Sequence, residues 1–158
     1  MSEQQTAISR RFRGFLPVVV DLETGGFNSQ TDALLEIAAI TLDLDPDGQL
    51  IQKDRFFFNV EPFKGANVEA SALEFTGIDI HNPLRKAVKE TRALEETLRG
   101  IRHQVRATGC NRAVMVAHNA SFDLGFMNAA VARCDIKRSP FHPFSTFDTA
   151  TLCGLAVG

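Results

Sequence analysis

The chain contains no tryptophan and no tyrosine, although it has 13 phenylalanines in 158 residues. Phenylalanine offers a flat apolar face and no hydrogen-bonding group, so its rings either pack in a core or stack on another flat group. Most of the 13 are expected in the core. Several, however, stand beside polar residues or glycines, where a core residue is not expected. The aromatic composition therefore permits a stacking surface without requiring one.

Long hydrophobic runs are missing, and the polar N-terminus lacks the pattern of a signal peptide. The three cysteines, Cys110, Cys134 and Cys153, are odd in number and widely spaced. This favours reduced thiols in a cytoplasmic protein over disulfides or a zinc site. With 44% hydrophobic and 23% charged residues, the composition indicates one globular domain, residues 11–158, behind a polar tail of residues 1–10.

An excess of positive charge is also missing, because the formal net charge is −2. The total does not indicate a nucleic-acid partner, and such a partner would have to be recognised by local basic clusters. One short cluster, residues 10–13, precedes the first predicted strand. A solvated patch is its default interpretation.

The stretch 15–27 organises the rest of the chain. Its β-branched run, residues 18–20, predicts a buried strand. Asp21 and Glu23 follow two residues apart, so both carboxylates leave the same face of the strand. The glycines at 25–26 then end the strand and allow a substrate backbone to come close. By itself, such a pair fits a solvated strand end as well as a site for one hard cation.

The remaining pattern predicts two further strands, a short helix, a long helix, a buried strand, a helix, and a last strand and helix. In chain order they cover residues 33–42, 55–60, 69–75, 84–107, 113–117, a helix capped by Ser121, 144–148 and 149–157. The first three strands should form a β-meander. The fold class is therefore α/β, with a mixed five-stranded sheet flanked by helices.

A third carboxylate, Asp123, falls in the first turn of the helix that follows strand 113–117. If that strand lies parallel to the first, Asp21, Glu23 and Asp123 meet in one crevice beyond the strand ends. Such an oxygen-rich site is what Mg²⁺ or Mn²⁺ prefers. Two ions of this kind can activate a water and stabilise the leaving oxygen of a phosphodiester.

Two short motifs carry a family resemblance. Residues 21–24, Asp-Leu-Glu-Thr, resemble the first motif of the DEDD exonucleases, and residues 118–123, His-Asn-Ala-Ser-Phe-Asp, resemble the second. Longer stretches, loops included, resemble the ribonuclease T family within this group, from about Arg11 to the last residue. They are residues 11–15, 32–41, 109–112, 115–119 and 141–149.

The resemblance implies a ribonuclease-H-like fold and a cytoplasmic, Mg²⁺-dependent 3′→5′ exoribonuclease with two metal ions. Such an enzyme trims tRNA CCA ends, matures other stable RNAs and also acts on single-stranded DNA. Asp21, Glu23 and Asp123 match the family's catalytic and metal-binding acids. The family works as a homodimer in which basic segments of one subunit feed RNA into the other's site. The matching positions are Arg11, Arg13, Arg106, Arg112 and Lys137.

The resemblance also implies that terminal bases stack on four phenylalanines. The matching positions are Phe27, Phe75, Phe122 and Phe144. Each stacked base is worth roughly 1–3 kcal/mol and tolerates many sequences. Phe27, beside Gly26, and Phe122, beside Asp123, point to substrate contact even without the family.

The family's third motif, a His followed five residues later by an Asp, supplies a general base and a further metal ligand. His81, His103 and His142 have no Asp at that spacing. His118 does stand five residues before Asp123, but both belong to the second motif, where His118 is expected to order the strand–helix turn. We therefore expect an exonuclease domain without its C-terminal helical part, and a 158-residue form that is inactive or weak.

Three other interpretations remain open. Another DEDD exonuclease, such as an oligoribonuclease, would prefer very short RNAs. A nucleic-acid-binding module with an inactive site would bind single strands without metal-dependent cleavage. A plain α/β domain with solvated acids would not bind RNA, and Asp21→Asn would change nothing.

Overall fold

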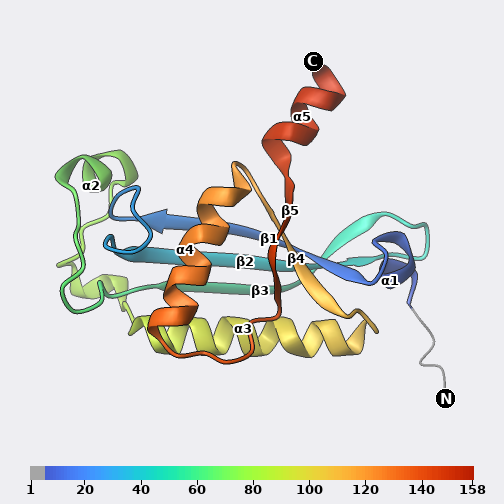
Figure 1. The fold of residues 1–158 in the computed structure, drawn as a ribbon, viewed down its shortest axis with the longest axis horizontal. Coiled ribbons are helices and arrows are strands. Elements are labelled where there is room, and N and C mark those ends of the chain that lie inside the picture. The colour runs from blue at the N-terminus through green and yellow to red at the C-terminus, as the bar shows by residue number, and fades with distance from the viewer. Residues whose placement is uncertain (1–5) are drawn as a thin grey trace.

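The computed structural model describes residues 6–158, which form one mixed sheet with helices packed on it (Figure 1). In chain order the elements are α1 (Ala7–Arg11), β1 (Phe15–Thr24), β2 (Leu34–Leu44), β3 (Leu50–Asn59), α2 (Ala70–Thr76), the 3₁₀ helix η1 (Pro83–Arg85), α3 (Glu90–Ala107), β4 (Arg112–Ala117), α4 (Ala120–Arg133), β5 (Phe141–Asp148) and α5 (Thr149–Val157). The predicted α/β class with five strands is confirmed.

The five strands lie in the order β3-β2-β1-β4-β5. β1, β2 and β3 pair antiparallel as the expected meander, while β4 pairs parallel with both β1 and β5. This arrangement places the C-terminal ends of β1 and β4 at the same edge, which is where a site forms in a sheet of this kind.

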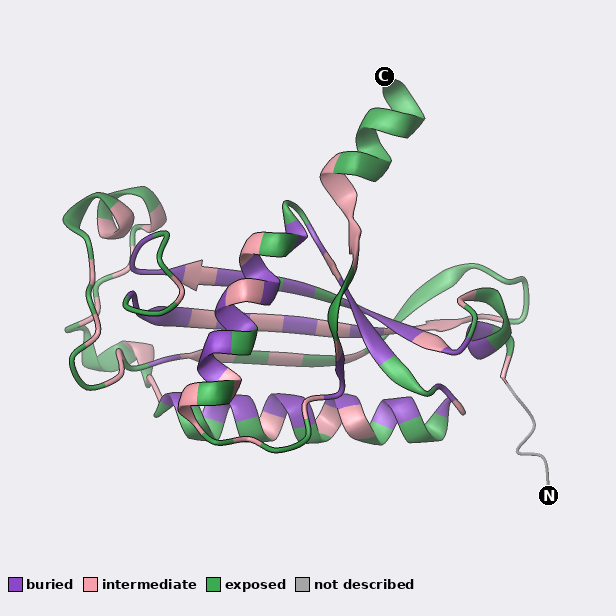
Figure 2. Ribbon diagram, in the orientation of Figure 1, coloured by how far each residue is buried: buried purple, intermediate pink, exposed green. Residues whose placement is uncertain are grey.

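One face of the sheet is buried. Alternate residues of β1, from Leu16 through Val18 and Val20 to Leu22, are at most 5% exposed. α3 packs on strands β1 to β4 through residues at helix spacing, including Leu94, Leu98, Ile101 and Val105, as predicted. Figure 2 shows this purple inner stripe along α3.

The opposite face is more open, because strand side chains alternate. It carries the row that pairs Asp21 with Ala38 and Ala38 with Phe57 across three strands. Asp21 is exposed, and the ring of Phe57 is 58% exposed. The first two acidic residues of the predicted site therefore lie on the open face.

Some predicted boundaries are wrong. β3 begins at Leu50 rather than at residue 55, and β5 at Phe141 rather than at 144. The long helix begins at Glu90 and not at residue 84, because η1 ends at Arg85 and the next residue, Lys86, has a φ of +50°, which cannot continue a helix. Residues 7–11, most of them assigned to the polar tail, form α1, and Ile8 is fully buried there. Residues 1–5 of that tail lie outside the described residues.

Ser121 does not cap α4. The cap position is Asn119, in the left-handed conformation with a φ of +58°. The helix end is instead satisfied by Asp148 at the end of β5, which accepts the backbone N–H groups of Asn119 and Ala120 at 3.2 and 3.0 Å. A cap supplied by a distant residue leaves no local sequence signal.

The C-terminal helix α5 is exposed along most of its length and extends away from the sheet (Figures 1 and 2). Neither α5 nor any other helix of residues 6–158 is long and apolar enough to cross a bilayer.

Candidate active site

The site lies where β1 and β4 separate. Their pairing ends at Val19 and Val116, so the last residues of β1 have no partner strand on that side. Asp123, in the first turn of α4, bonds to the unpaired part of β1: its Oδ1 accepts the backbone N–H of Leu22 at 3.2 Å. A pocket of about 490 Å³ surrounds this point.

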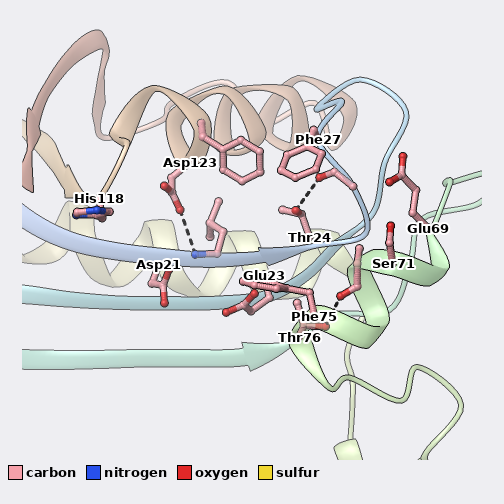
Figure 3. Close-up of a pocket in the computed structure, with 14 residues that line it drawn as sticks. Asp21, Glu23, Thr24, Phe27, Glu69, Ser71, Phe75, Thr76, His118 and Asp123 are labelled. Carbon is pink, nitrogen blue, oxygen red and sulfur yellow. Dashed lines mark hydrogen bonds between the residues drawn. The ribbon is translucent and has the colours of Figure 1, made fainter. Parts of the chain in front are cut away.

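The three predicted acids all line this pocket. Figure 3 shows Asp21 and Glu23 on one side of β1 and Asp123 approaching the strand from α4. Asp21 is exposed, Glu23 is half-buried, and Asp123 is 4% exposed. The expected convergence in one crevice is therefore seen, with the carboxylate of Asp123 held by the strand backbone.

The pocket raises the proton affinity of two of its acids. Burial raises the pKa of Glu23, and Asp21 and Glu36 add to the rise. Burial also raises the pKa of Asp123, to about 6, against the lowering effect of the Leu22 N–H, and the charges of Asp21 and Glu23 raise it further. Among residues 6–158, no ion pair neutralises any of the three acids.

This donor set suits a hard divalent cation in its chemistry, because it consists of carboxylate oxygens that repel one another and have no cationic partner. It is not a preformed cage: across residues 6–158, no three His, Cys, Asp or Glu side chains come together closely enough to hold an ion. The residues that would hold an ion are Asp21 and Glu23, with Asp123 beside them.

Aromatic rings form another part of the pocket wall. Phe27, Phe75 and Phe122 line it. The first two are 86% and 90% exposed, whereas Phe122 packs on the core residue Phe126 with ring centroids 4.9 Å apart. Phe27 meets Phe122 edge-on at 6.1 Å. Exposed rings of this size beside carboxylates are typical of a surface that takes up flat ligands.

Comparison with known proteins shows the family to which the chain belongs. A family profile described as "Exonuclease" matches residues 18–156. A protein named "Ribonuclease T" from Hahella chejuensis is 60% identical over 162 residues, covering 100% of this chain and 74% of that protein. The chain belongs to the ribonuclease T family. It is therefore an exonuclease, and exonucleases of the wider DEDD group, also called DnaQ-like, use divalent metal ions.

Solved structures show the same fold at much lower identity. Escherichia coli exonuclease I in complex with a dT13 oligonucleotide superimposes with a TM-score of 0.66 at 17% identity, over 90% of this chain and 29% of that one. The ExoI/SSB-Ct complex superimposes with a TM-score of 0.67 at 18% identity, over 90% of this chain and 30% of that one. The chain thus spans about a third of exonuclease I, and this likeness concerns the fold alone.

The other residues suggested by the ribonuclease T family lie outside the pocket lining. Phe144 is 78% exposed on β5, against the ring of His142. Arg106 and Lys137 line a separate groove between α3 and the segment after α4. Arg11, Arg13 and Arg112 lie at or near the N-terminal ends of β1 and β4, whereas the pocket lies at their C-terminal ends. The structure does not bring these five basic residues to the acids of the same chain.

Two histidines make local hydrogen-bonding contacts. His118 follows β4, lines the pocket and lies 3.2 Å from the Thr149 hydroxyl through Nδ1. The Nδ1 of His142 accepts the backbone N–H groups of Phe144 and Ser145 at 3.3 and 2.9 Å. Neither ring pairs with a carboxylate within residues 6–158.

Sequence reasoning missed the polar residues of α2 and of the position directly before it. Glu69, Ser71 and Thr76 line the pocket with Phe75 (Figure 3). The signal was available, because Ser71 lies four residues before Phe75 and therefore on the same face of a helix. Once Phe75 is assigned to the site, its helical neighbour follows.

Proposed function

We propose that the chain is the nuclease domain of a cytoplasmic, Mg²⁺-dependent 3′→5′ exoribonuclease. Its substrates are the 3′ ends of tRNA and other stable RNAs, and also single-stranded DNA. The proposal rests on one observation: a pocket in which Asp21, Glu23 and Asp123 lie beside two almost fully exposed phenylalanine rings. Its family membership supports the direction and class of the reaction.

The two walls of the pocket have different tasks. The rings of Phe27, Phe75 and Phe122 would stack on the terminal bases, which have flat faces whatever their sequence. Stacking selects a frayed or single-stranded end, because a paired base keeps its face covered. The exposed Asp21 and half-buried Glu23 would then lie beside the last phosphodiester.

The carboxylates would hold one or two divalent ions, which supply an activated water and stabilise the leaving oxygen when bound. The chain's own contribution is to keep the acids in place. The backbone N–H of Leu22 fixes Asp123, and the alternation of β1 keeps Asp21 and Glu23 on one face. Mn²⁺ would satisfy the same oxygen ligands.

We further propose that RNA reaches the pocket along basic residues of a second subunit, in a homodimer. Arg11, Arg13, Arg106, Arg112 and Lys137 would contact phosphates, and none of them lines the pocket of its own chain. Phe144, exposed on β5, would extend the stacking surface. A net charge of −2 is compatible with this function, because the basic residues are segregated from the acids.

A second candidate follows from the missing third motif. No His outside the second motif stands five residues before an Asp in residues 1–158. We propose that this chain alone cleaves weakly or not at all and acts as a single-strand-binding module. The two candidates share the pocket and differ only in catalysis.

The test is a cleavage and binding experiment on the purified chain. A 5′-labelled single-stranded RNA is incubated with Mg²⁺, and binding of the same RNA is measured by fluorescence anisotropy in EDTA. The exonuclease produces a ladder that shortens from the 3′ end and is lost in Asp21→Asn. Binding without a ladder supports the module. If the chain neither bound nor cleaved RNA, the result would support the plain α/β domain with solvated acids. A strong preference for very short RNAs would indicate an oligoribonuclease.

A further inference from the structure

A second buried carboxylate, Asp32, lies outside the acidic pocket, in the loop from β1 to β2. It is 3% exposed and accepts hydrogen bonds from three residues. Oδ2 accepts the backbone N–H of Asn28 at 3.0 Å, and Oδ1 accepts the Thr31 hydroxyl at 2.8 Å and the Asn67 amide at 3.0 Å. All three partners donate, so an asparagine at position 32 would direct its own NH₂ at a donor.

The loop is joined to the segment that leads into α2. Asn67 donates its N–H to the carbonyl of Thr31 at 2.8 Å, and its carbonyl accepts the N–H of Ala33 at 2.9 Å. Glu69, directly before α2, donates its N–H to the carbonyl of Gly25 at 2.7 Å. The β1–β2 loop and the start of α2 are therefore one hydrogen-bonded unit, and the Asp32 side chain bonds to both parts.

Gly26 fits against this carboxylate. A Cβ atom at Gly26 would lie 2.1 Å from Oδ2 of Asp32 and 3.2 Å from Cδ of Glu69, so a side chain there would displace the Asp32 carboxylate. The next residue is Phe27, and the one after it, Asn28, is bonded to Asp32. The exposed ring of Phe27 therefore projects from a backbone that is held on both sides.

We propose that Asp32 is a positioning residue for nucleic-acid binding, which sets the aromatic walls of Phe27 and Phe75 across the pocket. It touches no substrate. It fixes Phe27 through the Asn28 N–H and fixes the start of the Phe75-bearing helix through Asn67. This inference rests on the proposed function, since it assigns a role in the binding of that function's substrate.

The first measurement is the affinity of Asp32→Asn for a fluorescent single-stranded RNA in EDTA, by anisotropy. The expected Kd is about tenfold above that of the wild type, the loss of roughly one good base stack. Asp47→Asn, on an exposed turn, is the matched control and keeps the wild-type Kd. Gly26→Ala should reproduce the loss, because its Cβ displaces the same carboxylate without changing any charge.

A double-mutant cycle separates positioning from general destabilisation. In the Phe27→Ala/Phe75→Ala background, Asp32→Asn should change Kd by less than about twofold, because the rings it positions are gone. A tenfold loss that persists in this background would overturn the proposal. So would an Asp32→Asn variant that binds like the wild type.

Amide hydrogen exchange tests the same claim without any nucleic acid. Asp32→Asn should speed exchange at Asn28, Asn67 and Glu69, while Met115 in the buried strand β4 keeps its protection. If the wild type failed to bind RNA but this pattern appeared, the proposed function would fail and the positioning of the loop and α2 would stand. Unchanged exchange at all three amides would refute the positioning role whatever the RNA binding.

Discussion

Asp32 and Asp123 are only 3% and 4% exposed. Folding nevertheless lowers the pKa of Asp32 and raises the pKa of Asp123. Although burial raises the pKa of Asp32, hydrogen bonds from Asn28, Asn67 and Thr31 hold it below its ordinary value. Burial raises the pKa of Asp123 to about 6, because its main hydrogen bond, from Leu22, does not offset desolvation and the nearby acids. Three hydrogen-bond donors keep the pKa of Asp32 low, whereas desolvation and the charges of Asp21 and Glu23 keep the pKa of Asp123 high.

The largest expected effect is the loss of stability on removing the Asp32 carboxylate. Asp32→Ala removes the acceptor of three donors and should lower the free energy of unfolding by about 2 kcal/mol at pH 7, measured by urea denaturation. Because the pKa of Asp32 is lowered by folding, its contribution is present at neutral pH and is lost as pH falls through the folded-state pKa, below about 4. Asp47→Ala is the control and should change little. Equal losses for both variants would refute the donor argument.

The next largest effect is on binding. Phe27→Ala should weaken single-stranded RNA binding about tenfold, because one base stack is worth roughly 1–3 kcal/mol, yet leave stability nearly unchanged. The ring is 86% exposed, so its removal opens no cavity. Leu84→Ala, 82% exposed on η1, controls for the loss of exposed apolar surface. The assignment fails if both variants bind equally.

Removing the charge of Asp123 should raise the free energy of unfolding, whereas Asp32→Ala should lower it. Asp123→Asn removes a buried like charge and can still accept the Leu22 N–H, so it should stabilise the metal-free protein by about 1 kcal/mol at pH 8, after allowance for solvent screening at the open pocket. Folding raises this pKa, so the wild-type penalty grows as pH rises from about 4 to about 6 and is absent at lower pH. Thermal unfolding at pH 8 and pH 3.5 measures both. A gain that persists at pH 3.5 would show that the Asp123 charge is not its cause.

The smallest effect is expected at the groove between α3 and the segment after α4, which Arg106 and Lys137 line. Lys137→Gln should lower the slope of log Kd against log salt by roughly 0.7, the value for one phosphate contact on a single strand. Lys53→Gln, exposed on β3, should leave the slope unchanged. A slope that falls equally in both variants would mean that overall charge, and not the groove, attracts RNA.

The sequence predicted the sheet and the meeting of the three acids in one pocket, because both depend on short-range patterns. The β-branched run of β1, the i and i+2 spacing of Asp21 and Glu23, and the buried strand β4 are each visible in a few residues. The parallel neighbours β1 and β4 then bring Asp123 to the same pocket.

What the sequence did not predict depends on contacts between distant residues. Asp148 caps α4 from 28 residues away, so Ser121 was a misleading signal. Asp32 bonds to Asn67 across 35 residues, and nothing near either residue indicates the pair. The place of Ser71 in the pocket differs from these, because its spacing of four residues from Phe75 in α2 is a local signal.

The most direct test of the metal-holding pocket is a titration with paramagnetic Mn²⁺, followed in the amide NMR spectrum of the metal-free chain. The structure predicts selective broadening at residues 21–23 and 123, and its loss in Asp21→Asn. This readout needs neither RNA nor turnover, so it is independent of the missing third motif. Broadening centred on other acidic residues, or unchanged in Asp21→Asn, would contradict the assignment of this pocket as the active site.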